Sequence, residues 1–237
     1  MVKRGMKHLV GLPSLRKEVE DICARAREHC KLGLRPQNLI VPLDPGNGRT
    51  SVLEYVSGMY RKYGVLDFSS GPDPFVEIEL DGSLKQMKQA FCTVEDAAIY
   101  ANHYSHVVGM DVSEMAVHIH ESQFQEFLRR TKELCGEACV IFFVHEARGR
   151  NEERLIERLR ETVDFVKKLP EEPYSPEELC EAVRLALEEE GARVGEDPTL
   201  CSRLLRRIRE ANLHSVREAR LAVQKILRGE ENGVEQE

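Results

Sequence analysis

Leu43-Asp-Pro-Gly-Asn-Gly-Arg-Thr50 lies between the apolar run 38–43 and residues 50–63, whose apolar side chains recur at helical spacing. A glycine-bearing turn between a buried strand and a helix is the setting of a phosphate-binding loop, because glycines let the backbone curl and aim its N–H groups at an anion. The stretch therefore predicts a nucleotide-binding α/β domain. The residues expected to bind nucleotide here are Asp44, Pro45, Gly46, Asn47, Gly48, Arg49, Thr50 and Ser51.

Two residues of this loop depart from the phosphate-loop pattern. The pattern requires a lysine that reaches the β- and γ-phosphates and a hydroxyl that binds magnesium. Thr50 supplies the hydroxyl and is the candidate metal ligand, whereas Arg49 replaces the lysine and Leu43 replaces the first glycine. We therefore expect weak binding of ATP or ADP with Mg²⁺.

Short apolar runs alternate with helical stretches through the first two thirds of the chain. Strands are predicted at 75–80, 115–120, 138–144 and 162–166, and helices at 94–108, 123–134 and around 151–160. Strands that alternate with helices of this length indicate βαβ units and a parallel sheet. The predicted fold class is a three-layer α/β domain over residues 1–168.

The pattern changes after Lys168. Residues 169–176 form a proline-rich linker, and helices are predicted from 176, over 199–211 and over 215–227, with a tail at 229–237. Residues 171–198 carry ten acidic and two basic side chains, and residues 201–228 carry eight basic and two acidic ones. These charges indicate either two helix faces that attract each other in a small helical domain, 169–228, or a basic face that binds a partner such as nucleic acid.

Composition excludes several classes of protein. The chain has 237 residues, of which 41% are hydrophobic and 32% charged, with a formal net charge of −7. It has no apolar run long enough to span a membrane, and its basic start lacks the long apolar core that a secretory signal needs. Its seven cysteines are scattered without a Cys-x-x-Cys pair. These features predict a cytoplasmic protein with reduced thiols and no membrane partner. The negative net charge argues against nucleic-acid binding over the whole surface, but leaves a local basic face possible.

The segments that flank the loop resemble one protein family. They are His8–Val19, Leu32–Leu34, Tyr60–Leu66, Tyr174–Leu179 and Ser215–Arg220. They resemble the AAA+ ATPases, specifically the group of the red-type rubisco activases and stage V sporulation K proteins. The resemblance covers roughly residues 7–228 and is thin between about 80 and 113. It implies a P-loop nucleotide-binding domain followed by a small helical lid, assembled into a ring with itself or another AAA+ protein and acting on a protein client.

The departures from this family lie at its chemical residues. The predicted third strand ends in His118-Ile-His120-Glu121, where the family has an Asp-Glu pair. A neutral histidine at 120 cannot supply the anion that positions magnesium, whereas Glu121 is a candidate to polarise a water. His118 and His120 would share one face of that strand, as metal ligands can, but no third ligand is visible.

The resemblance also assigns roles to two arginines. Arg158 falls at the arginine finger, which acts on a neighbouring subunit's nucleotide, and Arg217 falls at sensor 2, with sensor 1 near His145. Either arginine could instead be an ordinary surface residue in so charged a chain.

Three hypotheses for function follow. The first is a degenerate AAA+ protein, a pseudo-ATPase that senses nucleotide or serves as a scaffold within an oligomer. The second is an active ATPase in which Arg49 binds the phosphates through its guanidinium fork and which remodels proteins. The third is a nucleic-acid- or protein-binding module that uses the basic helices 201–228.

Overall fold

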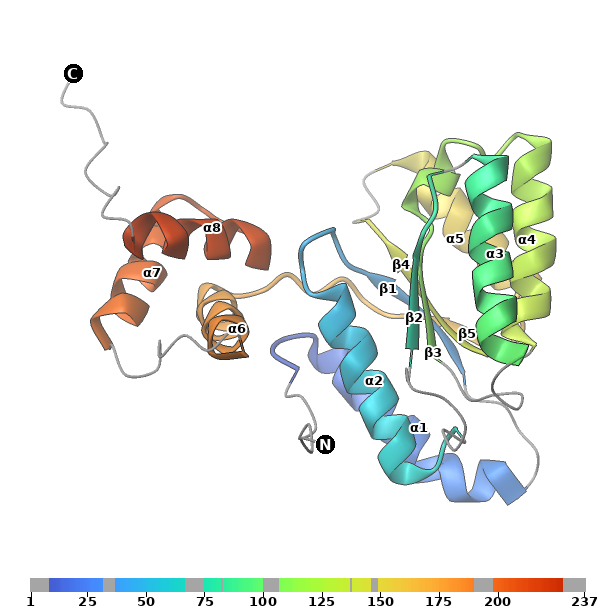
Figure 1. Ribbon diagram of the computed structural model, residues 1–237, viewed down its shortest axis with the longest axis horizontal. Coiled ribbons are helices and arrows are strands. Elements are labelled where there is room, and N and C mark those ends of the chain that lie inside the picture. Colours follow the sequence, from blue (N-terminus) through green and yellow to red (C-terminus); the bar gives the residue numbers. More distant parts are fainter. Residues whose placement is uncertain are drawn as a thin grey trace. The chain divides into compact units, whose positions relative to one another are not determined.

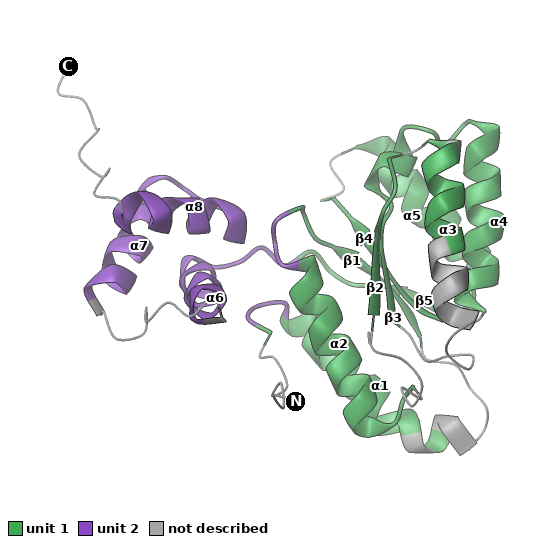
Figure 2. Ribbon diagram, viewed as in Figure 1, with its two compact units in different colours: residues 1–9, 13–45, 49–171 green, residues 10–12, 46–48, 172–237 purple. Residues whose placement is uncertain are grey.

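The computed structural model of the chain describes residues 9–31, 37–66, 75–81, 83–99, 107–136, 138–145, 149–189 and 198–227 (Figure 1). They form two compact units, coloured in Figure 2. The first comprises residues 1–9, 13–45 and 49–171, and the second comprises 10–12, 46–48 and 172–237. The predicted tail at 229–237 lies outside the described residues.

The first unit contains the parallel sheet that the sequence predicts. Its strands are β1 (Asn38–Pro42), β2 (Phe75–Glu79), β3 (Val107–Asp111), β4 (Cys139–Val144) and β5 (Val166–Lys168). They pair in the order β2-β3-β4-β1-β5, and every pairing is parallel. The α/β fold class is therefore confirmed.

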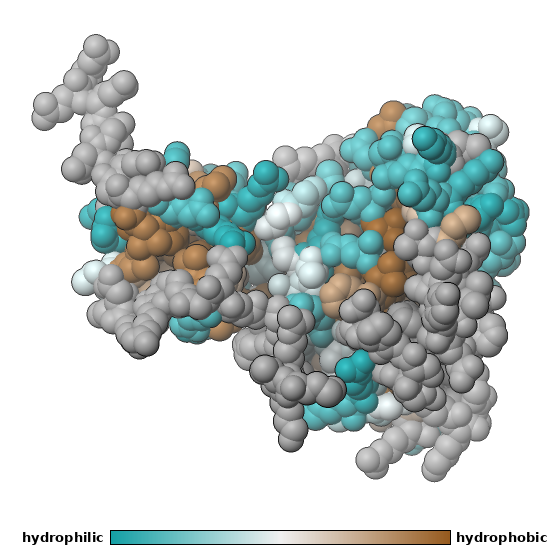
Figure 3. Space-filling view, in the orientation of Figure 1, coloured by the Kyte–Doolittle hydropathy of each residue, from teal (hydrophilic) through white to brown (hydrophobic). Residues whose placement is uncertain are grey.

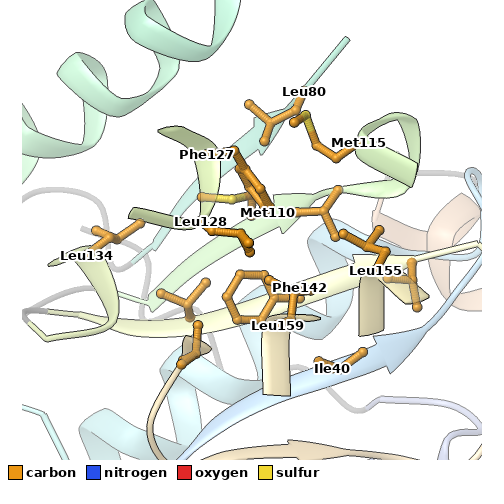
Figure 4. Close-up of a cluster of buried hydrophobic side chains, with 14 of the residues drawn as sticks. Ile40, Leu80, Met110, Met115, Phe127, Leu128, Leu134, Phe142, Leu155 and Leu159 are labelled. Atoms are coloured by element: carbon orange, nitrogen blue, oxygen red, sulfur yellow. The ribbon is translucent and has the colours of Figure 1, made fainter. Parts of the chain in front are cut away.

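Helices cover both faces of this sheet (Figure 1). On one face lie α1 (Pro13–Lys31) and α2 (Arg49–Tyr63), and on the other lie α3 (Leu84–Ile99), α4 (Ser122–Cys135) and α5 (Arg150–Thr162). Every residue of β4 is buried, as expected of a central parallel strand. Figure 4 shows Phe142 of β4 and Met110 of β3 packed among side chains of α4 and α5, such as Phe127 and Leu159.

The prediction of the third strand is wrong. Residues 113–116 form a short 3₁₀ helix (η1, Ser113–Ala116) and residues 117–120 form turns, whereas the strand runs over Val107–Asp111, where a helix was expected to end. Gly109 at the centre of β3 weakens its strand signal. The glycine is needed because a methyl group there would lie 2.5 Å from the Leu53 side chain of α2.

The fifth strand begins later than predicted. Helix α5 continues to Thr162, so the predicted strand at 162–166 is replaced by a turn and by β5 at 166–168. Asn38 holds this turn, because its backbone N–H donates to the Phe165 carbonyl at 2.8 Å and its side chain donates to the Asp164 carbonyl at 3.3 Å.

The second unit contains three helices, α6 (Pro176–Glu189), α7 (Pro198–Glu210) and α8 (Val216–Leu227), at the positions that the sequence predicts. Its core includes Leu179, Val183, Leu204, Ile208 and Val223. Capping boxes begin α6 and α8. In each, a serine hydroxyl accepts the backbone N–H of a glutamate three residues on, and that carboxylate accepts the serine N–H in return.

The described surface carries few exposed large apolar side chains. They are Tyr63, Val117, Phe165, Leu221 and Leu227. On the face seen in Figure 3, most of the described surface of the first unit is hydrophilic. None of the described helices combines the length and the apolar character that crossing a membrane requires.

Candidate functional site

The loop between β1 and α2 has the backbone of a glycine-dependent turn. Gly46 and Gly48 have φ angles of +85° and +81°, a region that residues with a Cβ rarely adopt. The Leu43 N–H donates to the Val144 carbonyl at 2.8 Å and fixes the start of the loop against β4. The predicted strand–turn–helix setting is therefore present.

Arg49 lies under this loop, and its exposed fraction is 7%. Its Nε and Nη2 atoms both donate to the Leu43 carbonyl oxygen, at 3.3 and 3.1 Å, and Nη1 donates to the Asp111 carboxylate. The guanidinium also lies 5.6 Å from the centre of the Phe143 ring. The fork that could have bound phosphate is thus engaged with the first residue of the loop and with the end of β3.

An acidic residue, Asp111, lies at the end of the third strand, where the sequence analysis expected His120. It ends β3, and its Oδ1 accepts the Ser113 backbone N–H at 3.1 Å and the Ser113 hydroxyl at 2.7 Å. The Ser113 hydroxyl oxygen accepts the His145 N–H at 3.0 Å. One chain of hydrogen bonds therefore joins Arg49 through Asp111 and Ser113 to the carboxyl end of β4, where sensor 1 was expected.

The same contacts determine the charge of Asp111. Burial raises the pKa of its carboxyl, but the hydrogen bonds from the Ser113 hydroxyl and backbone and the neighbouring Arg49 charge outweigh burial and hold the pKa below its usual value. Asp111 is therefore an anion at neutral pH, and Arg49 is the cation that balances it.

The residue that follows Asp111 is Val112, which is fully buried, so no carboxylate stands directly after the end of β3. Glu121 occupies the N-cap position of α4 without a side-chain capping hydrogen bond. It is exposed, with its carboxylate 3.0 Å from the Nδ1 atom of His118. It does not follow a strand, and His118 and His120 lie in a turn and share no strand face. Among the described residues, no group of three His, Cys, Asp or Glu side chains is arranged to hold a metal ion.

The predicted magnesium ligand, Thr50, has a different partner. Its hydroxyl donates to the Glu77 carboxylate of β2 at 2.8 Å. Its neighbours Pro45 and Ser51 are exposed, and Asp44 is partly exposed. The predicted role of Asp44, Pro45 and Ser51 in nucleotide binding therefore stays a prediction.

The tip of the loop clusters with the second unit, and its polar groups bind α8. The Asn47 side-chain oxygen accepts the Val216 N–H at 3.1 Å and thereby caps the first turn of α8. The Arg217 N–H donates to the Gly46 carbonyl at 3.2 Å, and the Tyr174 hydroxyl donates to the Asn47 carbonyl at 3.1 Å. The sequence analysis missed this cap because Asn47 and Val216 lie 169 positions apart. Arg217 lies next to Gly46, and its role as a sensor 2 residue stays a prediction.

Arg158 lies on the exposed side of α5. Its guanidinium pairs with Glu161 one turn further along the helix, at 3.1 Å, and both side chains are well exposed. Such a pair contributes little to stability and releases its arginine at little cost.

Comparisons with known proteins identify the fold. No protein-family model matches the chain, and no curated protein matches it. Among solved structures, domain III of the Thermotoga maritima replication initiation protein DnaA matches with a TM-score of 0.53 and 16% identity, covering 97% of this chain and 90% of that one. The Aeropyrum pernix ORC1 protein in complex with DNA matches with a TM-score of 0.52 and 17% identity, covering 99% of this chain and 65% of that one. A point mutant of Thermotoga maritima RuvB matches with a TM-score of 0.51 and 11% identity, covering 100% of this chain and 77% of that one.

The chain shares the fold of these proteins, a parallel sheet covered by helices with a helical C-terminal region. At this level of identity the likeness extends to the fold alone. It does not single out the rubisco activase and stage V sporulation K group, which stays a prediction.

The first prediction concerns the ion pair under the loop. Replacing Arg49 by Ala leaves the Asp111 carboxylate, whose side chain is 16% exposed, without its cation. We expect the free energy of unfolding to fall by about 3 kcal/mol. Arg49→Lys keeps the charge but loses the fork, and should cost about 1.5 kcal/mol. Urea denaturation measures both variants. Equal stability of Arg49→Ala and the wild type would contradict a structural role for this arginine.

The second prediction concerns acid stability. Because the folded-state pKa of Asp111 lies below the value in the unfolded chain, roughly 3.9, the carboxylate stabilises the fold above that pH and loses this contribution as pH falls through the folded-state pKa. In Asp111→Asn, the free energy of unfolding should be lower at neutral pH and should decline less steeply below about pH 4. An unchanged acid slope, from denaturation at a series of pH values, would show that Asp111 carries no such contribution.

Proposed function

We propose that the chain is a pseudo-ATPase, an AAA+-fold subunit whose phosphate loop is closed by its own arginine and which serves as a scaffold or nucleotide sensor in an oligomer. The observation that carries this proposal is the buried contact of Arg49 with both Leu43 and Asp111. Those three positions correspond to the lysine, the first glycine and the magnesium aspartate of a working site.

The argument is electrostatic. Magnesium needs an anion at the end of β3, and Asp111 already neutralises a guanidinium there. A bound Mg²⁺ would have to displace Arg49, which would leave a buried cation without its carboxylate. The γ-phosphate would in turn meet no lysine. Both costs oppose nucleotide binding, and Val112 supplies no carboxylate to activate water.

A subunit of this kind can still act on a partner. An arginine finger stabilises the transition state in a neighbouring subunit and accelerates hydrolysis by roughly 10³–10⁵-fold. Arg158 is exposed and its guanidinium pairs with the exposed Glu161, so it could reach a neighbour without loss of internal packing. We therefore propose a ring partner with a competent site, either another AAA+ protein or a second form of this subunit, together with a protein client.

A second candidate is a nucleic-acid-binding module. Helix α7 carries Arg203, Arg206, Arg207 and Arg209, and the similar ORC1 structure contains DNA. Arg206 already pairs with Glu210, and Arg209 pairs with Glu177. Nucleic acid is therefore the secondary proposal, and DNA binding that weakens steeply with added salt would support it.

The third prediction tests the closed loop. Calorimetry should give a dissociation constant for Mg-ATP in the high micromolar range or weaker, about −5 to −6 kcal/mol, and phosphate release should be far slower than in intact AAA+ enzymes. The variant Arg49→Lys frees Asp111 from the guanidinium fork and restores a lysine to the loop. It should bind Mg-ATP at least tenfold more tightly.

Arg150→Lys, the same substitution on the exposed start of α5, is the matched control and should leave binding unchanged. Tight magnesium-dependent binding by the wild type, with brisk hydrolysis that falls in Glu121→Gln, would instead establish the working-ATPase hypothesis.

The fourth prediction tests the action in trans. After a partner screen, Arg158→Ala should change the stability of this chain by less than about 0.5 kcal/mol, because the residue is exposed. It should lower the partner's ATPase rate by at least about tenfold. Arg160→Ala, on the same helix, is the control and should leave that rate unchanged. If the chain is monomeric at high concentration and the screen recovers no AAA+ partner, the proposed assembly is refuted.

A further inference from the structure

Two cysteines meet within the helical unit. Cys180 lies on α6 and Cys201 on α7, and the Cys180 sulfur lies 3.7 Å from the Cys201 carbonyl oxygen, which accepts its S–H. Both side chains are half-buried. Of the other described cysteines, Cys23, Cys135 and Cys139 are buried and Cys92 is exposed on α3.

The surroundings hold the two cysteines in place. Cys180 packs on the core of the helical unit, next to Leu179 and one turn before Val183, and Cys201 follows the buried Leu200. Helices α6 and α7 face each other across this core. The two cysteines are therefore fixed on neighbouring helices and do not lie on loops, which favours a bond between them over bonds to distant thiols.

The chemistry of the Cys180 thiol depends on its neighbour. Burial is the largest cause that raises its pKa to about 11, and the negative charge and the hydrogen bond of the Cys201 side chain act in the same direction. Cys180 is consequently protonated at neutral pH and is not the thiol that attacks first.

We propose that Cys180 and Cys201 form an oxidisable thiol pair, a modification site at which a small disulfide such as oxidised glutathione generates a covalent link between α6 and α7. This inference does not depend on the proposed function.

The reaction balances as two thiol–disulfide exchanges. The Cys201 thiolate attacks one sulfur of oxidised glutathione, forms a mixed disulfide and releases one glutathione thiolate. Cys180 then loses its proton to that thiolate or to water, and its sulfur attacks the Cys201 sulfur. The Sγ–Sγ bond forms and the second glutathione leaves. Two protein thiols are oxidised, and one glutathione disulfide is reduced to two thiols.

The link closes a loop that includes all residues between the two cysteines. Such a bond stabilises a protein chiefly by restricting its unfolded chain. It would make the helical unit more resistant to unfolding and leave the core of the α/β unit unchanged. Oxidation would thus act selectively on one of the two units.

The test treats the full-length chain with oxidised glutathione, blocks remaining thiols by alkylation and maps the peptides by mass spectrometry. We expect a cross-linked pair of peptides containing Cys180 and Cys201, lighter by two hydrogen atoms than the separate peptides. The cross-link should form faster as pH rises, because the second step needs the Cys180 thiolate. The oxidised chain should resist proteolysis of the helical unit.

Cys180→Ser and Cys201→Ser should each abolish the cross-link, whereas Cys92→Ser, the exposed control, should leave it intact. If a serine variant fails to fold, the corresponding alanine variant, Cys180→Ala or Cys201→Ala, replaces it in the test. A stable glutathione adduct on Cys201 without closure, or alkylation of both thiols after oxidation, would overturn the proposal. So would a cross-link that joins either cysteine to a different partner.

Discussion

The contact between the Arg49 guanidinium and the Asp111 carboxylate is the interaction on which the rest of the site depends. Each charge is largely buried and needs the other, because an isolated buried ion is strongly destabilising. Arg49 also holds the Leu43 carbonyl, and Asp111 holds Ser113, which receives the His145 N–H. One pair of charges therefore ties the base of the loop to the carboxyl ends of β3 and β4.

The loop between β1 and α2 therefore makes structural contacts both at its base and at its tip. Its base is closed by Arg49 within the α/β unit, and Asn47 at its tip caps α8 within the helical unit. Under the proposed function, groups that would bind phosphates and magnesium in an active site instead bind other parts of the protein. The proposed pseudo-ATPase follows from this reassignment, with the exposed Arg158 available to a partner.

Much of the fold could be predicted because its signals are local. The glycine turn at 43–50, the all-apolar β4 and the capped helices of the second unit can each be identified from residues close in sequence. The third strand could not, because Gly109 is required by Leu53 of a distant helix and removes the strand signal. Because of this error, the sequence analysis placed the end of the strand at His120 and overlooked Asp111, the residue that ends β3. The sequence also could not show that Asp111 is the partner of Arg49, because no local pattern joins residues 49 and 111.

A double-mutant cycle on Arg49→Met and Asp111→Asn tests the central claim most directly. Denaturation of the wild type, both single variants and the double variant gives the coupling free energy between the two side chains. The closed-loop account predicts a favourable coupling of at least about 2 kcal/mol, with the double variant more stable than the sum of the single effects implies. A coupling within about 0.5 kcal/mol of zero would show that the two residues act independently, and would contradict the account.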